Sequence, residues 1–75
     1  MNNRTNKKIN GMVNAMKNSN GKFFSLTTTT TDGPINAQFR QETPHYVVVN
    51  DRNGGRTRRF SKSSLVGLKM GQTEI

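Results

Sequence analysis

The sequence predicts a small α+β domain, mainly β, in which an N-terminal helix precedes five antiparallel strands that close into a barrel. The chain has 75 residues, enough for one small domain. Its apolar residues repeat with a helical period before residue 21 and with the period-2 alternation of strands after it. Turn residues recur about every ten residues, and short strands at this spacing commonly close on themselves, which removes exposed sheet edges.

The composition limits both fold and function. Val, Ile, Leu and Phe supply 15 of the 75 residues, so the core is small, and the absence of cysteine excludes disulfides and cysteine-bound metals. Twelve Lys and Arg residues oppose four acids, and the net charge of +8 attracts polyanions. The longest apolar run, residues 46–49, is far below the ~20 residues needed to span a membrane, and no signal peptide is visible. We therefore expect no membrane partner, and the absence of cysteine is compatible with a cytoplasmic setting.

Residues 1–20 are expected to form a basic amphipathic helix. Within residues 4–17, an apolar stripe follows the i, i+3, i+4, i+7 spacing of a helix face: Ile9, Met12, Val13 and Met16. Gly11 and several asparagines lower the helix propensity, so this helix should form only where its stripe docks. It either covers one end of the sheet or is a disordered basic arm that orders on a partner.

A first hairpin follows the helix. Residues 22–31 alternate as a long strand, with Phe24, Leu26 and Thr28 on one face. Asp32-Gly33 then supplies a turn, and residues 35–40 alternate again as the second strand.

A second hairpin is predicted around Asn53-Gly54, the strongest turn signal in the chain. Residues 46–49 are apolar on both faces, which suits a central strand. A two-residue turn places Asp51 opposite Arg56 and Val47 opposite Phe60. With Phe60 inward, the arginines at 56 and 58 would share its face, so the strand either twists out of the core or contains a bulge.

The last strand follows a serine-rich turn at residues 61–64. Val66, Leu68 and Met70 alternate and complete a barrel of residues 21–71, and residues 72–75 are expected to be a frayed tail. This last strand would leave an edge at residues 66–70 that is open to pairing with another copy, so a homo-oligomer is one expectation.

Short motifs along residues 21–71 resemble those of Sm-like and SH3-like barrels. They are GKFFSL at 21–26, DG at 32–33, INAQFR at 35–40, YVVVND at 46–51, RF at 59–60, Leu65, and LKMG at 68–71. In detail they are similar to a group of small bacteriophage proteins known as SH3 β-barrel-containing proteins. The resemblance implies this fold and a phage product acting in the cytoplasm of a bacterial host. It implies no activity, because the group shares no assigned chemistry.

The sequence gives little support for an enzyme. It holds one histidine and no cysteine, and neither a serine nor an acid stands at a spacing typical of nucleophilic catalysis with His45. His45 and Glu42 supply at most two neighbouring metal ligands, whereas a zinc site needs at least three. We expect no catalysis, no metal and no cofactor.

A basic cluster is the best functional candidate in the sequence. It consists of Arg52, Arg56, Arg58, Arg59 and Lys62. Four further cations would extend its field: Arg40, Lys7, Lys8 and Lys17. Arginine suits bidentate contact with phosphate, and small barrels bind single strands by combining basic side chains with exposed aromatic rings. Phe23 and Tyr46 are the aromatic residues most expected to lie outside the core.

Two functions follow from this cluster. The first is binding of nucleic acid, DNA or RNA, through the phosphate backbone; five neutralised phosphates on a duplex would give a salt slope of about −4.5. The alternative is a protein-interaction module that binds and modulates a host bacterial protein through an acidic face of that partner. A third interpretation is that the cluster is only a solvated basic surface that maintains solubility.

Overall fold

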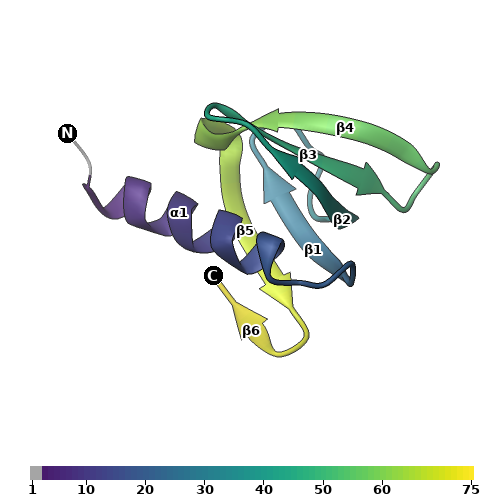
Figure 1. The fold of residues 1–75 in the computed structure, drawn as a ribbon, viewed down its shortest axis with the longest axis horizontal. Coiled ribbons are helices and arrows are strands. Elements are labelled where there is room, and N and C mark those ends of the chain that lie inside the picture. The colour runs from purple at the N-terminus through teal and green to yellow at the C-terminus, as the bar shows by residue number, and fades with distance from the viewer. Residues whose placement is uncertain (1–2) are drawn as a thin grey trace.

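The computed structural model describes residues 3–75, with side chains from residue 7 onward, so residues 1 and 2 of the predicted helical segment lie outside the described residues. One helix, α1 (Asn3–Lys17), precedes six antiparallel strands (Figure 1). The strands are β1 (Phe23–Thr28), β2 (Ile35–Glu42), β3 (Tyr46–Asp51), β4 (Arg56–Ser61), β5 (Leu65–Met70) and β6 (Thr73–Glu74). A single 3₁₀ turn, η1 (Lys62–Ser64), connects β4 to β5.

The strands form one open sheet in the order β4-β3-β2-β1-β5-β6, so the predicted closure into a barrel is wrong. The chain passes from β4 to β5 through η1 alone, and the two strands diverge from that corner (Figure 1). The corner is held by two main-chain hydrogen bonds, from Lys62 N to His45 O (2.9 Å) and from Thr29 N to Ser64 O (2.8 Å). Beyond it, β5 pairs with β1 and β4 pairs with β3, so among residues 3–75 no ladder joins β4 to β5.

The C-terminal residues are also not the frayed tail that was predicted. β6 pairs with β5, Lys69 opposite Glu74 and Met70 opposite Thr73. Beyond β6, Ile75 and Leu68 exchange two main-chain hydrogen bonds of 3.0 and 2.7 Å. Gly71 adopts φ 55°, which a tight turn after β5 requires and glycine tolerates. This segment covers the part of the β5 edge that was expected to be open to another copy.

The first predicted strand is shorter than expected. β1 ends at Thr28, because the threonines that follow it form a turn of their own. Thr31 N and Thr31 Oγ1 both donate to Thr28 O, at 3.3 and 3.2 Å, and Thr31 Oγ1 accepts from Thr28 N at 3.1 Å. Threonine hydroxyls commonly compete with ladder hydrogen bonds in this way.

The core lies between α1 and one face of the sheet, which we call the inner face. The apolar stripe of α1 packs against β5 and β2, and Met12 and Met16 are fully buried. The inner face contributes the rest of the core: Phe24, Leu26, Ala37, Val47, Val49, Phe60, Leu65 and Leu68. The helical stripe and its docking on the sheet are therefore confirmed. No helix in residues 3–75 is both long enough and apolar enough to cross a membrane.

Candidate nucleic-acid interface

The basic residues predicted as one cluster are divided between the two faces of the sheet. β4 pairs with β3 in unbroken register, with Val47 opposite Phe60 and Asp51 opposite Arg56, as the turn signal predicts. Because side chains alternate along a strand, Arg58 shares the inner face with Phe60, whereas Arg59 points to the opposite, outer face. The cluster is continuous in sequence but not in space.

Arg58 lies on the inner face, and β4 contains no bulge. Its Nη1 donates to Asp51 Oδ2 at 3.1 Å, and its guanidinium lies 5.0 Å from the centre of the Phe60 ring. Asp51 is 7% exposed and also accepts a hydrogen bond from Asn53 N at 2.9 Å. The ion pair thus resolves the conflict that the sequence raised. Arg56, at the end of the hairpin, is exposed.

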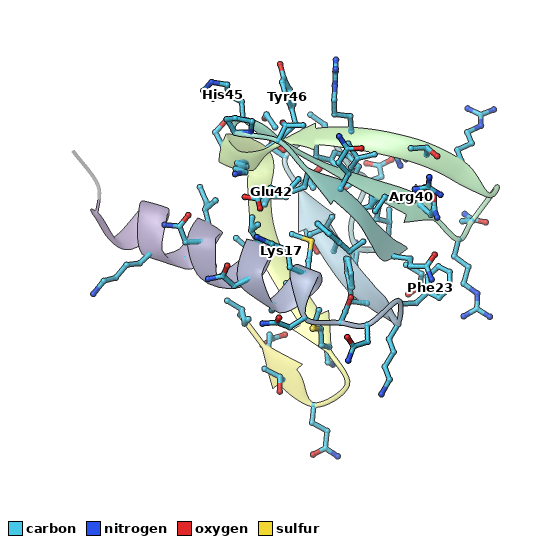
Figure 2. The ribbon with its side chains drawn as sticks, viewed as in Figure 1. Lys17, Phe23, Arg40, Glu42, His45 and Tyr46 are labelled. Atoms are coloured by element: carbon cyan, nitrogen blue, oxygen red, sulfur yellow. The ribbon has the colours of Figure 1, made fainter. Side chains whose placement is uncertain are left out.

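Two more of the predicted cations are bound to one carboxylate. Glu42, at the end of β2, contacts Lys62 of η1 at 2.6 Å. It also contacts Lys17 of α1 at 3.0 Å, and Figure 2 shows these two side chains close together. The hydrogen bonds from Lys62 and then Lys17 hold the pKa of Glu42 below its ordinary value of 4.5. Through Glu42, Lys62 and Lys17 therefore link η1 and α1 to the end of β2. Lys7 and Lys8 are exposed on α1, which covers the inner face.

The outer face of β1–β4 combines exposed aromatic rings with arginines. Phe23 is 44% exposed and Tyr46 is 38% exposed, so both rings expected outside the core lie there. The guanidinium of Arg52 lies 5.3 Å from the centre of the Phe23 ring, and that of Arg59 lies 4.5 Å from the centre of the Tyr46 ring. These distances are within the range of cation–π contacts.

Strand register creates both arginine–ring pairs. Tyr46 is opposite Ser61 and Val48 is opposite Arg59, so Arg59 is a diagonal neighbour of Tyr46 on the same face. Arg52 follows inward-facing Asp51, and its N donates to Asn36 O at 2.9 Å, which extends the β2–β3 pairing by one residue. Asn36 is opposite Ser25 on β1, so Arg52 is level with Ser25 and its guanidinium reaches Phe23 diagonally across β2.

Arg40 joins this face through an irregularity in β2. The register between β2 and β3 shifts between Phe39 and Gln41, so Arg40 and Gln41 together oppose Val48. Arg40 is exposed, and Figure 2 shows it toward the same end of the sheet as Phe23, with Tyr46 beside His45 at another corner. The sequence predicted Arg40 as an extension of the basic field but did not predict the bulge.

A row of hydrogen-bonded polar side chains crosses the outer face beside Phe23. Thr57 Oγ1 donates to Asn50 Oδ1 at 3.3 Å, and Asn50 Nδ2 donates to Gln38 Oε1 at 3.2 Å. Gln38 Nε2 in turn donates to Gly21 O. Sequence reasoning missed this row, although its signal was present as polar residues at outward register positions of three strands.

The two acids of β1–β4, Glu42 and Asp51, both lie on the inner face, each with a basic partner. The outer face of these four strands and the residue after β3 thus present Arg40, Arg52 and Arg59, and none of the three forms an ion pair with a carboxylate among the described side chains. Three of the twelve basic residues of the chain thus lie together on one face and add a local positive field there.

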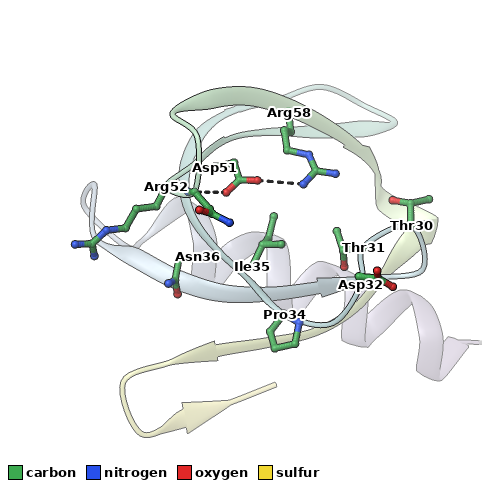
Figure 3. A pocket seen from close by; sticks show the side chains of 10 residues that line it. Thr30, Thr31, Asp32, Pro34, Ile35, Asn36, Asp51, Arg52 and Arg58 are labelled. Carbon is green, nitrogen blue, oxygen red and sulfur yellow. Dashed lines mark hydrogen bonds and ion pairs between the residues drawn. The ribbon is translucent and has the colours of Figure 1, made fainter.

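A polar pocket of about 580 Å³ opens between the β1–β2 turn and the β3–β4 hairpin (Figure 3). The Asp51–Arg58 pair forms part of its wall, and Figure 3 shows Asp32 and Pro34 on the opposite side. Within residues 7–75, no buried side-chain nitrogen or oxygen lacks a hydrogen-bond partner, and no three His, Cys, Asp or Glu side chains gather as a metal site.

No protein-family model matches the chain, and neither a curated protein nor a solved structure matches it. No family is thereby identified. The structure shows a small α+β protein with an N-terminal helix and a six-stranded antiparallel sheet.

Proposed function

We propose that the protein binds nucleic acid through the outer face of β1–β4 and catalyses no reaction. The observation that carries this proposal is the separation of charge across the sheet. Arg40, Arg52 and Arg59 share the outer face without an acid, while Glu42 and Asp51 are neutralised on the inner face. Guanidinium groups suit phosphate oxygens, to which they can donate two parallel hydrogen bonds.

Fewer residues are proposed to contact phosphate than the sequence suggested. Lys62, Lys17 and Arg58 already form ion pairs within the molecule, so binding of phosphate would require them to exchange partners. Arg56, Lys7 and Lys8 contribute to the long-range field from other parts of the surface. We also propose that the fold is an opened form of the SH3-like barrel of small phage proteins, which would place its action in a bacterial cytoplasm.

Fluorescence anisotropy of labelled oligonucleotides at several salt concentrations tests the proposal. Three phosphate contacts predict a slope of log K against log salt of about −2 for a single strand and about −2.7 for a duplex. Replacing Arg52 or Arg59 by Ala should reduce the slope by about 0.7 to 1, the share of one contact. Arg56→Ala is the matched control, because it removes the same charge from the hairpin end. No binding to either nucleic acid at low salt would exclude the proposal.

A second function is favoured by one observation, the free edge of β4. Within residues 3–75, β4 pairs only with β3, so its outer backbone groups are open to an added strand. Its arginines would repel a second copy of this edge and attract an acidic segment of a host protein. Capture of a bacterial partner that survives nuclease treatment, and is lost when Thr57 is replaced by Pro, would support this alternative.

A further inference from the structure

We infer that Phe23 and Tyr46 are two base-stacking positions and that the ligand is a single-stranded nucleic acid. This inference rests on the proposed function and specifies its substrate. The chain has five aromatic residues (four Phe and one Tyr) for a small core, yet two of them, Phe23 and Tyr46, are left 44% and 38% exposed on one face. Exposed rings on a basic sheet are the feature by which sheet proteins bind single strands.

Each ring lies beside an arginine that could contact the same nucleotide. Bases stack on aromatic rings and on guanidinium planes alike. Arg52 and Arg59, at 5.3 and 4.5 Å from their ring centres, could therefore extend the stacking surface while their N–H groups reach a phosphate. In a duplex the bases are stacked on one another and paired, so neither ring could reach a base face. The arrangement therefore selects unpaired nucleotides.

The register sets the length of strand that can use both positions. Phe23 is opposite Gln38 on β2, Gln38 is opposite Asn50 on β3, and Tyr46 lies four residues before Asn50. Two strand spacings of about 4.8 Å and four residue rises of about 3.4 Å separate the positions by about 17 Å. At about 3.4 Å per stacked nucleotide this distance corresponds to about five nucleotides. A dinucleotide can occupy only one position.

The polar row beside Phe23 predicts weak sequence preference. Gln38, Asn50 and Thr57 bond to one another, so much of their hydrogen-bonding capacity is already used within the protein. Reading of base identity requires free donors and acceptors aimed at base edges. Stacking on a ring, in contrast, is available to every base.

Aromatic substitutions with two ligands test the inference. Phe23→Leu and Tyr46→Leu keep an apolar side chain, remove no charge and affect exposed positions. Each should weaken binding of an oligothymidine of about eight nucleotides by about 5- to 150-fold, the effect of losing one stacked base. The salt slope should stay unchanged, and binding of a duplex of equal length should change little. Val66→Ala is the control, because Val66 is 45% exposed and apolar but not aromatic.

The outcomes separate the inference from the proposed function. Equal affinity for single strand and duplex, with no effect of either leucine variant, would overturn the stacking positions while phosphate binding stands. Absence of binding to both ligands would overturn both. We expect a dinucleotide to bind much more weakly than the longer strand. If the two ligands bound with equal affinity, Phe23 and Tyr46 could not be two separate stacking positions.

A spectroscopic readout tests stacking directly. The chain has no tryptophan, so Phe23→Trp and Tyr46→Trp each introduce a single reporter at one position. Both variants should retain binding, because tryptophan also stacks, and each fluorescence should be quenched by the single strand. Inorganic polyphosphate supplies charge without bases and should not quench. Binding by anisotropy without quenching in either variant would refute the inference.

Discussion

The ion pair between Asp51 and Arg58 predicts unequal effects for two substitutions, because its members differ in burial. The Asp51 side chain is 9% exposed and the Arg58 side chain is 37% exposed. In Arg58→Met the carboxylate stays almost without water and keeps only the hydrogen bond from Asn53 N, at 2.9 Å. Breaking a buried pair costs about 3–5 kcal/mol, and we expect about 3 kcal/mol because that bond remains.

Asp51→Asn should cost less, about 1 to 1.5 kcal/mol. The amide oxygen of the new side chain can still accept from Asn53 N, and Arg58 is exposed enough to turn to water. The double variant should resemble Asp51→Asn alone, because removing the carboxylate also removes the reason for the larger loss in Arg58→Met.

Urea and thermal denaturation measure these differences. A 75-residue protein has a free energy of unfolding of about 4–11 kcal/mol, so a loss of 3 kcal/mol is a large share. It should lower Tm by about 12–24 °C. Arg56→Met, which removes the same charge from an exposed neighbour, should change stability by no more than about 0.5 kcal/mol. Equal losses in the two single variants, or an additive double variant, would refute the reasoning from burial.

Three further predictions concern the rest of the fold. Glu42→Gln should flatten the dependence of Tm on pH below 4.5, because a lowered pKa stabilises the folded state above the ordinary value and this contribution is lost as pH falls; parallel curves for the two proteins would contradict it. Leu26→Ala, at a fully buried position, should cost about 2–5 kcal/mol in urea denaturation, and a smaller loss would show that the sheet collapses around the cavity. Deleting residues 72–75 uncovers β5 and should give concentration-dependent association in sedimentation velocity; a strictly monomeric truncation would refute this role of β6.

Local pattern was enough to predict most elements of the fold. The helical stripe needed only the spacing of Met12, Val13 and Met16, and the β3–β4 register needed only the turn at Asn53-Gly54. Whether the sheet closes depends on contacts between residues that are far apart in the sequence. The pairing of the C-terminal residues depends on the backbone angle of a single residue. The two hydrogen bonds of Ile75 with Leu68 follow from the left-handed Gly71, which in the sequence is one glycine among seven.

The candidate site was predicted by residue type but not by arrangement. The sequence identified Arg52 and Arg59 as members of one run, and alternation along β4 then separated Arg59 from Arg58. Glu42 binds Lys17 and Lys62, which lie 25 and 20 residues away in the chain, so neither contact has a local signal. The pairing of Arg52 with Phe23 likewise depends on β1, β2 and β3 lying side by side.

The alternation of buried and exposed residues along these strands also bears on how the protein can change over time. Phe23 stands next to buried Phe24, and Tyr46 stands next to buried Val47, so the residues proposed for recognition differ from the residues of the core on the same strands. Substitutions of exposed residues usually alter stability by less than about 0.5 kcal/mol. New ligand preferences could thus arise by mutation without loss of the fold, and a library randomised at outward-facing positions should consist mainly of folded proteins.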